Sequence, residues 1–289
     1  MNKLHTILVT GSTGQLGQSI QSIATDYPEY EFVFANRQQL DLSNEVSITK
    51  FFERKTFDII INCAAHTAVD KAESEPELAN QINHLAVQRL ADIAKQKNIK
   101  FIHISTDYVF NGKQYRPYIE TDIVEPQSVY GQTKLSGEQA IQKTLTKNAI
   151  IIRTGWVYSE YGNNFVKTML RLGQERDNLS VIFDQIGSPT YARDLSRAIM
   201  SIIQSQSFLQ IDFTTRIVHY SNEGVCSWYD FAKTIFEFAN IKCNINAIET
   251  KDYPTPAKRP HYSVLNKAKI KQTFNVTIPY WKDSLIKCI

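Results

Sequence analysis

A glycine-rich turn directly after the first apolar stretch constrains this chain more than any other feature. Residues 6–10 read TILVT, which is β-branched and apolar, and they run straight into GSTGQLG at 11–17. Glycines in such a turn let the backbone bend tightly and let a diphosphate approach the N–H groups at the start of the next helix. Because the turn follows a predicted strand and precedes a predicted helix, we expect a dinucleotide site here; the alternative is a close-packed turn without a ligand.

Strand-like and helix-like patterns alternate through the first half of the chain. Further strands are expected at 31–35, 58–62, 101–105 and 149–153. Repeated β–α units of this kind imply an α/β fold, a Rossmann-type doubly wound parallel sheet covered on both faces. The regular alternation of strand-like and helix-like patterns ends near residue 160. We therefore expect an NAD(P)-binding domain over 1–160 and a smaller C-terminal α/β substrate-binding domain over 161–289, with their segments interleaved.

The composition excludes several other classes of protein. The chain has 289 residues, of which 43% are hydrophobic and 21% charged, so it can bury a large core and is not disordered. The net charge of +3 is too small for an obligate nucleic-acid binder, and no stretch resembles a membrane span or a signal peptide. The 4 cysteines form no CxxC pair, which favours reduced thiols. We expect a cytoplasmic protein that binds neither nucleic acid nor a membrane.

The end of the second expected strand bears on the choice of dinucleotide. A carboxylate at this place would bind the ribose 2′-hydroxyl of NAD. The sequence instead reads Ala35-Asn36-Arg37, and a guanidinium can pair with the 2′-phosphate of NADP. Arg37 therefore favours NADP, with a solvated surface arginine as the alternative.

The segment YGQTK places a tyrosine and a lysine four residues apart. On a helix, Tyr130 and Lys134 share one face. A free phenol has a pKa near 10, and a nearby ammonium together with the charge of an oxidised nicotinamide would stabilise the phenolate. A shift of about three units corresponds to roughly 4 kcal/mol. The pair is therefore a candidate acid–base couple.

A second polar segment, Ser105-Thr106-Asp107, ends an expected parallel strand, where open α/β sheets place their active sites. A hydroxyl of Thr106 or Ser105 can hydrogen-bond a substrate carbonyl. Together with Tyr130 and Lys134, this chemistry suits hydride transfer between a nicotinamide and a carbonyl, with the tyrosine moving the proton. The alternative is a buried structural tyrosine with the lysine in solvent.

Longer motifs carry a family resemblance. They are AAHTAVDKAESEPELA (64–79), STDYVFNG (105–112), VYGQTKLSGE (129–138), RTGWVY (153–158), GNNFVKTML (162–170) and YPTPAKRP (253–260). With the glycine turn, they resemble the dTDP-4-dehydrorhamnose reductase family of the extended short-chain dehydrogenases/reductases. These matches run from the first strand nearly to the C-terminus.

The resemblance implies reduction of the C4 keto group of dTDP-4-dehydro-β-L-rhamnose by NADPH or NADH. The product would be dTDP-L-rhamnose, a precursor of cell-surface polysaccharide such as O-antigen. Tyr130 would be the proton donor, Lys134 its partner and ribose anchor, and Thr106 the contact to the sugar carbonyl, with Asp107 and Trp156 bordering the sugar. By motif position, the dinucleotide would be lined by Gly11, Gly14, Gln15, Leu16, Asp41, Leu42, Ala65, His66 and Thr67.

Two expectations concern charged groups. Arg259, in the proline-rich segment, is our candidate for gripping the substrate diphosphate, with a surface charge as the alternative. Some family members are metal-bridged dimers that use surface carboxylates, so the resemblance implies Mg²⁺ as a candidate metal. This chain has Gln18-Ser19 and Arg193 at the corresponding places. We therefore predict no protein-bound metal, and a monomer or a homodimer.

Two other functions compete with the reductase. An NDP-sugar epimerase or dehydratase of the same superfamily would keep its dinucleotide tightly bound, but Tyr108 stands where a dehydratase would have a second acid. A non-catalytic, reductase-like regulatory subunit of methionine adenosyltransferase would not need a competent tyrosine, lysine and threonine, all of which this chain has.

Overall fold

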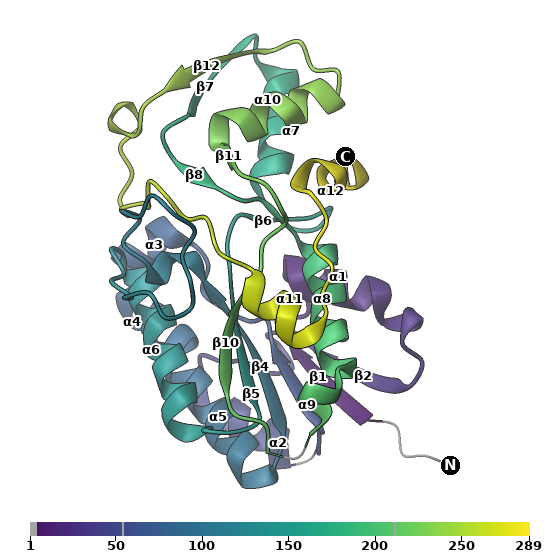
Figure 1. Cartoon of the computed structure of the whole chain (residues 1–289). Coiled ribbons are helices and arrows are strands. Elements are labelled where there is room, and N and C mark those ends of the chain that lie inside the picture. The colour runs from purple at the N-terminus through teal and green to yellow at the C-terminus, as the bar shows by residue number, and fades with distance from the viewer. Residues whose placement is uncertain (1–4, 54, 211) are drawn as a thin grey trace.

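A six-stranded sheet forms the centre of the molecule (Figure 1). The computed structural model describes residues 5–53, 55–210 and 212–289. The strand order is β2-β1-β3-β4-β5-β10, and every neighbouring pair is parallel. The strands are β1 (His5–Thr10), β2 (Tyr30–Ala35), β3 (Ile59–Asn62), β4 (Lys100–Thr106), β5 (Ala149–Thr154) and β10 (Arg216–His219). The Rossmann-type parallel sheet expected from the sequence is confirmed.

Both faces of the sheet are covered because its central strands are apolar on both sides. Every residue of β3 and β5 is buried, as is typical of parallel sheets between two helix layers. Ile7 and Ile61 point into one core, whereas Leu8 and Ile60 point into the other. The first core contains α1 (Gln15–Ile23), α8 (Ala192–Gln204) and α11 (Ala268–Phe274), and the second α2 (Glu45–Glu53), α5 (Ala86–Lys97) and α6 (Val129–Thr144).

The strand order places the opening of a crevice at the carboxyl ends of β1 and β3. From β1 the chain first adds β2 on one side and then returns to add β3 on the other. Loops diverge at such a switch point, and open α/β sheets bind their ligands there. Thr10 and Asn62 end these two strands, and Thr106 and Thr154 end the next two.

A smaller lobe stands over the large sheet, at the top of Figure 1. Its core is rich in aromatic residues, including Tyr158, Phe231 and Trp281. Its strands are β6 (Val157–Tyr158), β7 (Asn178–Ile182), β8 (Ile186–Gly187), β9 (Thr190–Tyr191), β11 (Cys226–Ser227) and β12 (Asn244–Ile248). Its helices are α7 (Phe165–Glu175), α10 (Trp228–Phe238) and α12 (Trp281–Cys288).

Residues after 161 contribute both to the large sheet with its helices and to the smaller lobe. Strand β10 pairs with β5, and helices α8 and α11 cover one face of the large sheet. The remaining helical elements are η1 (Ala24–Asp26), α3 (Val69–Ser74), α4 (Pro76–Asn80), η2 (Gln81–Leu85), η3 (Asp107–Val109), α9 (Gln206–Leu209) and η4 (Thr250–Asp252). No helix within the described residues, long or short, has the length and apolarity needed to cross a membrane.

Candidate active site

The glycine turn between β1 and α1 is shaped by close backbone approaches. Gly11 has a φ of +64°, and a Cβ there would lie 2.8 Å from the backbone of Ala64. A Cβ on Gly17 would lie 2.4 Å from the Gly11 carbonyl oxygen. Gly14 is the N-cap of α1 and has no side chain with which to cap the first turn. The N–H groups at the start of α1 are thus left for an external acceptor, so the turn fits a dinucleotide diphosphate.

The side chains of Gln15 and Leu16 are engaged within the protein. Gln15 Oε1 accepts hydrogen bonds from Ser159 Oγ (3.0 Å) and Asn164 Nδ2 (2.9 Å), and its Nε2 donates to Val157 O (3.3 Å). Gln15 therefore ties the glycine turn to the smaller lobe. Leu16 is buried in the core between α1 and the sheet, which leaves its backbone as the part that can face a cofactor.

The residues after β2 present an exposed guanidinium paired with a carboxylate that Ser43 holds in place. Asp41 accepts hydrogen bonds from the backbone N–H (2.9 Å) and the hydroxyl (2.7 Å) of Ser43, and the hydroxyl bond is the main reason that the pKa of Asp41 is lowered. Arg37 is 73% exposed and its Nε lies 3.6 Å from Asp41 Oδ1. Leu42 is buried beside them. The Arg37 guanidinium is thus placed to reach a phosphate at this edge.

The loop after β3 is held by hydrogen bonds to Asn83, a residue that the sequence analysis did not identify. Asn83, buried in η2, accepts a hydrogen bond from His66 N (2.8 Å) and donates to His66 O (3.1 Å) and Thr133 Oγ1 (3.2 Å). The His66 ring lies 3.2 Å from Glu75 Oε2. Asn83 therefore joins the loop containing the partly exposed Ala65 and the exposed Thr67 to helix α6. A polar side chain on an otherwise apolar helix face was the available signal.

Tyr130 lies in the first turn of α6, packed edge-on against Tyr108 at 5.5 Å between ring centroids. Burial raises the pKa of the phenol to about 12, while hydrogen bonding to Thr106 opposes the shift and the charge of Asp107 adds to it. In the protein alone, burial therefore outweighs the other effects, and Lys134 is not among the groups that shift this pKa. The expected decrease also depends on the positive charge of an oxidised nicotinamide and stays a prediction for the protein with its cofactor.

The side chain of Lys134 is buried against strand β4. The alternative interpretation of the sequence, in which this lysine lies in solvent, is therefore wrong. Its Nζ donates to Ile104 O (2.6 Å) and lies 3.3 Å from His103 Nε2. Burial lowers the pKa of Lys134 to about 8, with Glu138 opposing the shift. The ammonium is therefore close to losing its charge near neutral pH.

Thr106 and Asp107 form a linked pair at the end of β4. Thr106 Oγ1 donates to Asp107 Oδ1 (3.0 Å) and accepts from Tyr108 N (3.2 Å). Burial raises the pKa of Asp107 to about 6, while hydrogen bonds from Thr106 and Ser263 oppose the shift. The Thr106 hydroxyl also lies within hydrogen-bonding reach of the Tyr130 phenol, so the structure brings these two residues together.

Trp156 is held at the base of the smaller lobe in a constrained conformation. Its φ is +51°, and its ring stacks on Trp228 with 3.5 Å between centroids and 7° between planes. A Cβ on Gly187 would lie 2.6 Å from Trp156 Cε2, so that glycine makes room for the ring. The partly exposed indole is a rigid apolar surface that suits a sugar face.

Arg259 joins the proline-rich segment to α3. Its guanidinium binds the Asp70 carboxylate with two hydrogen bonds, Nη2 to Oδ2 (2.7 Å) and Nη1 to Oδ1 (3.1 Å). The positive charge of Arg259 also opposes the rise that burial causes in the pKa of Tyr108, whose ring contacts Tyr130. The guanidinium thus lies near Tyr130, and the Asp70 carboxylate occupies the two donors that we expected to bind a diphosphate.

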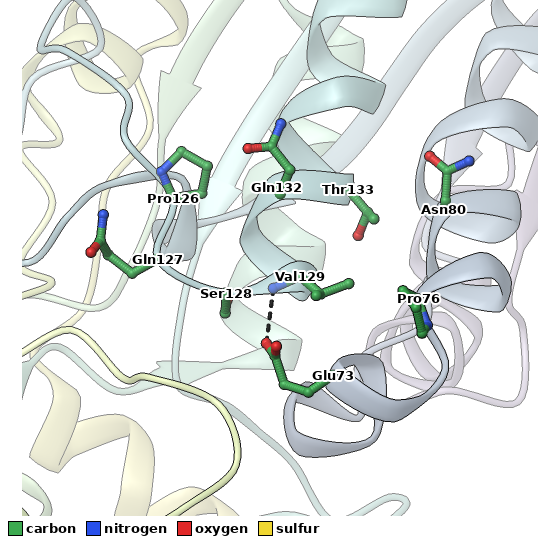
Figure 2. A pocket seen from close by; sticks show the side chains of 9 residues that line it. All are labelled: Glu73, Pro76, Asn80, Pro126, Gln127, Ser128, Val129, Gln132 and Thr133. Atoms are coloured by element: carbon green, nitrogen blue, oxygen red, sulfur yellow. Dashed lines mark hydrogen bonds between the residues drawn. The ribbon is translucent and has the colours of Figure 1, made fainter.

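A hollow of about 490 Å³ lies beside the first turn of α6 (Figure 2). Its wall consists of Glu73, Pro76, Asn80, Pro126, Gln127, Ser128, Val129, Gln132 and Thr133. Glu73 Oε1 accepts a hydrogen bond from Val129 N (2.9 Å), and Ser128 Oγ accepts one from Gly131 N (3.2 Å). The hollow borders Tyr130 without including it, and Glu73 stabilises the start of the helix that carries the tyrosine.

A partly exposed tyrosine and a buried lysine one turn apart on a helix, at the carboxyl edge of a parallel sheet, define a short-chain dehydrogenase/reductase. The model of the RmlD substrate binding domain family matches residues 5–289, and the chain belongs to this family. It is 42% identical to the dTDP-4-dehydrorhamnose reductase of Aggregatibacter actinomycetemcomitans, with 96% of each chain covered. The family resemblance read from the motifs is therefore confirmed.

Solved structures agree with this assignment. A dTDP-4-dehydrorhamnose reductase from Clostridium acetobutylicum superimposes with a TM-score of 0.92 at 41% identity, covering 98% of each chain. The same enzyme from Bacillus anthracis, solved in complex with NADP, gives a TM-score of 0.92 at 37% identity over 99% of each chain.

Proposed function

We propose that this protein reduces the C4 keto group of dTDP-4-dehydro-β-L-rhamnose to give dTDP-L-rhamnose, with NADPH or NADH as the reductant. The observation that carries the proposal is the placement of the partly exposed Tyr130 and the buried Lys134 on α6, with Tyr130 within hydrogen-bonding reach of Thr106 at the end of β4. Membership of the reductase family supports the substrate, and the NADP complex of a relative supports the cofactor.

The residues of the site have separate tasks in this reaction. The Thr106 hydroxyl turns from Asp107 to donate its hydrogen bond to the carbonyl oxygen, and Tyr130 gives its phenolic proton to the developing alkoxide. Lys134 offsets the charge left on the phenolate, while Asp107 and Trp156 orient the sugar. A nicotinamide, when bound, supplies the hydride. Because the phenol has a raised pKa in the protein alone, it is fully protonated at neutral pH and ready to act as the acid.

The direct test follows the absorbance of the reduced nicotinamide while the enzyme acts on the keto-sugar nucleotide, and then identifies the product sugar. We expect stoichiometric oxidation of NADPH and formation of dTDP-L-rhamnose. Copurified NAD without net NADPH consumption would instead favour an epimerase or dehydratase. Capture of a partner protein without any NADPH oxidation would favour a regulatory subunit.

We predict that Arg37→Ala raises the KM for NADPH about tenfold and leaves the KM for NADH within about twofold, since charge-assisted hydrogen bonds to a phosphate contribute about 1.5–3 kcal/mol. Steady-state kinetics with each nucleotide measure the effect. Arg176→Ala, at an exposed position of the smaller lobe, is the matched control. Equal losses with both nucleotides would reject the role of Arg37 at the 2′-phosphate.

We predict that Arg259→Ala raises the KM for the sugar nucleotide about tenfold, because a guanidinium can bind a diphosphate through two oxygens. The KM for NADPH should stay within about twofold. Asp70→Asn removes the competing carboxylate and should leave the KM for the sugar nucleotide unchanged or lower it. An unchanged KM in Arg259→Ala would assign the arginine to the Asp70 ion pair alone.

A further inference from the structure

A line of buried polar side chains crosses the large sheet beneath the candidate site. Thr10 in β1 is the register partner of Asn62 in β3, and Asn62 is the register partner of His103 in β4. Lys134 of α6 follows next to His103. Each of these four residues is at most 1% exposed. Buried polar groups are costly unless they are hydrogen-bonded, so their contacts with each other decide their protonation.

The hydrogen bonds along this line run in one direction. Thr10 Oγ1 donates to Asn62 Oδ1 (2.6 Å), which turns the amide nitrogen of Asn62 toward His103 Nδ1 at 3.1 Å. An amide nitrogen only donates, so Nδ1 accepts, and a neutral imidazole then carries its hydrogen on Nε2. That N–H faces Lys134 Nζ at 3.3 Å. A neutral amine can accept this hydrogen, whereas an ammonium cannot.

The charges around Lys134 leave its protonation finely balanced. Burial holds the pKa of His103 well below its ordinary value, so the ring stays neutral. Burial likewise lowers the pKa of Lys134 to about 8, opposed by Glu138 on its own helix and by Cys63 after β3. Arg153 of β5 is bound to that glutamate. His103 of β4 is the remaining titratable group that contacts the lysine nitrogen.

We propose that His103 is a positioning residue of the active site, an inference that rests on the proposed reduction. Its Nε2–H lies against Lys134 Nζ and favours the uncharged amine, so that the imidazole lowers the pH above which the lysine loses its charge. The same line of contacts reaches Thr10, which directly precedes the glycine turn. The geometry of the lysine is thereby tied to the loop that receives the dinucleotide.

The sign of the pH effect follows from this arrangement. Activity falls as the pH rises through the pKa of Lys134, because a neutral amine no longer offsets the charge of the phenolate. The wild-type protein should therefore lose activity with a midpoint near pH 8. Removing the Nε2–H removes an interaction that favours the neutral amine, so the midpoint should move upward by about one pH unit.

Two substitutions separate a positioning role from a packing role. In His103→Asn, the shorter side chain can accept the hydrogen bond from Asn62 as Nδ1 does, but it presents no N–H to Lys134. In His103→Gln, the longer side chain can place its amide N–H where Nε2–H lies and present it to Lys134. We expect His103→Asn to shift the alkaline midpoint of activity upward by about one unit, with the KM for NADPH within about twofold. His103→Gln should restore the midpoint to within about 0.3 unit. Equal effects of both variants, or an unmoved midpoint in His103→Asn, would overturn the proposal.

A second readout does not depend on activity. Nitrogen NMR of the full-length protein labelled in histidine, with His103→Gln used for assignment, should show Nε2 as the N–H nitrogen and Nδ1 as the bare one. Both resonances should titrate with a midpoint near pH 8 in the wild-type protein and not in Lys134→Met. An N–H on Nδ1, or a titration that persists without Lys134, would overturn the inference. Failure of the proposed function would appear separately, as a wild-type protein that oxidises no NADPH.

Discussion

Tyr130→Phe is expected to lower kcat about 100-fold or more, in line with the loss of a positioned acid–base group. The change removes the phenolic oxygen and keeps the ring, so the edge-on contact with Tyr108 remains. The melting temperature should therefore stay within a few degrees of the wild-type value, about the shift produced by 1 kcal/mol or less. Single-turnover oxidation of NADPH and thermal unfolding measure the two quantities.

The matched control for this substitution is Tyr115→Phe, because Tyr115 is 92% exposed and lies away from α6 in the sequence. We expect it to retain full activity. A Tyr130→Phe variant that keeps half or more of the wild-type turnover would remove this tyrosine from the mechanism. A variant that loses activity together with its cooperative unfolding would point to a structural role instead.

Arg153→Met is expected to destabilise the protein by about 3–5 kcal/mol, because it leaves a buried carboxylate without its partner. The side chains of Arg153 and Glu138 are 3% and 1% exposed, and Arg153 Nη2 lies 2.7 Å from Glu138 Oε2. Ser105 Oγ also donates to Glu138. The free energy of unfolding, measured with urea, should fall accordingly at neutral pH.

A solvent-exposed pair supplies the comparison for that prediction. Arg171 and Glu175 form an ion pair on α7 with side chains 60% and 52% exposed. Arg171→Met should cost less than about 1 kcal/mol, since water screens such pairs. Replacing both Arg153 and Glu138 with apolar residues should recover part of the loss, because no unpaired charge then stays buried. If Arg153→Met costs no more than Arg171→Met, the buried pair does not stabilise the fold.

The elements proposed to bind the dinucleotide and to carry the acid–base couple were predictable because they depend on neighbours in the sequence. A strand, a glycine turn and a helix form within residues 5–23, and the four-residue spacing of Tyr130 and Lys134 places both on one helix face. Thr106 was predictable for a related reason, since the carboxyl ends of parallel strands meet at one edge of the sheet.

The partners of these residues were not predictable in the same way. Asn83, His103 and Glu138 each lie within an apolar or helical pattern, where a single polar residue has many explanations. Their contacts reach across 15 to 50 residues of sequence, as in Glu138 with Arg153 and Asn83 with Thr133. Such contacts follow from which strands are adjacent, and local propensity does not specify strand order.

The class of fold, the glycine turn and the spacing of the proposed acid–base pair follow from the order of the residues, because periodicity and spacing encode them locally. The burial of Lys134 against His103, the ion pair of Arg259 with Asp70 and the return of β10 from the second half of the chain to the large sheet are visible only in the folded molecule. The physical reason is that burial and strand adjacency set protonation and pairing, and both arise only when distant segments pack together.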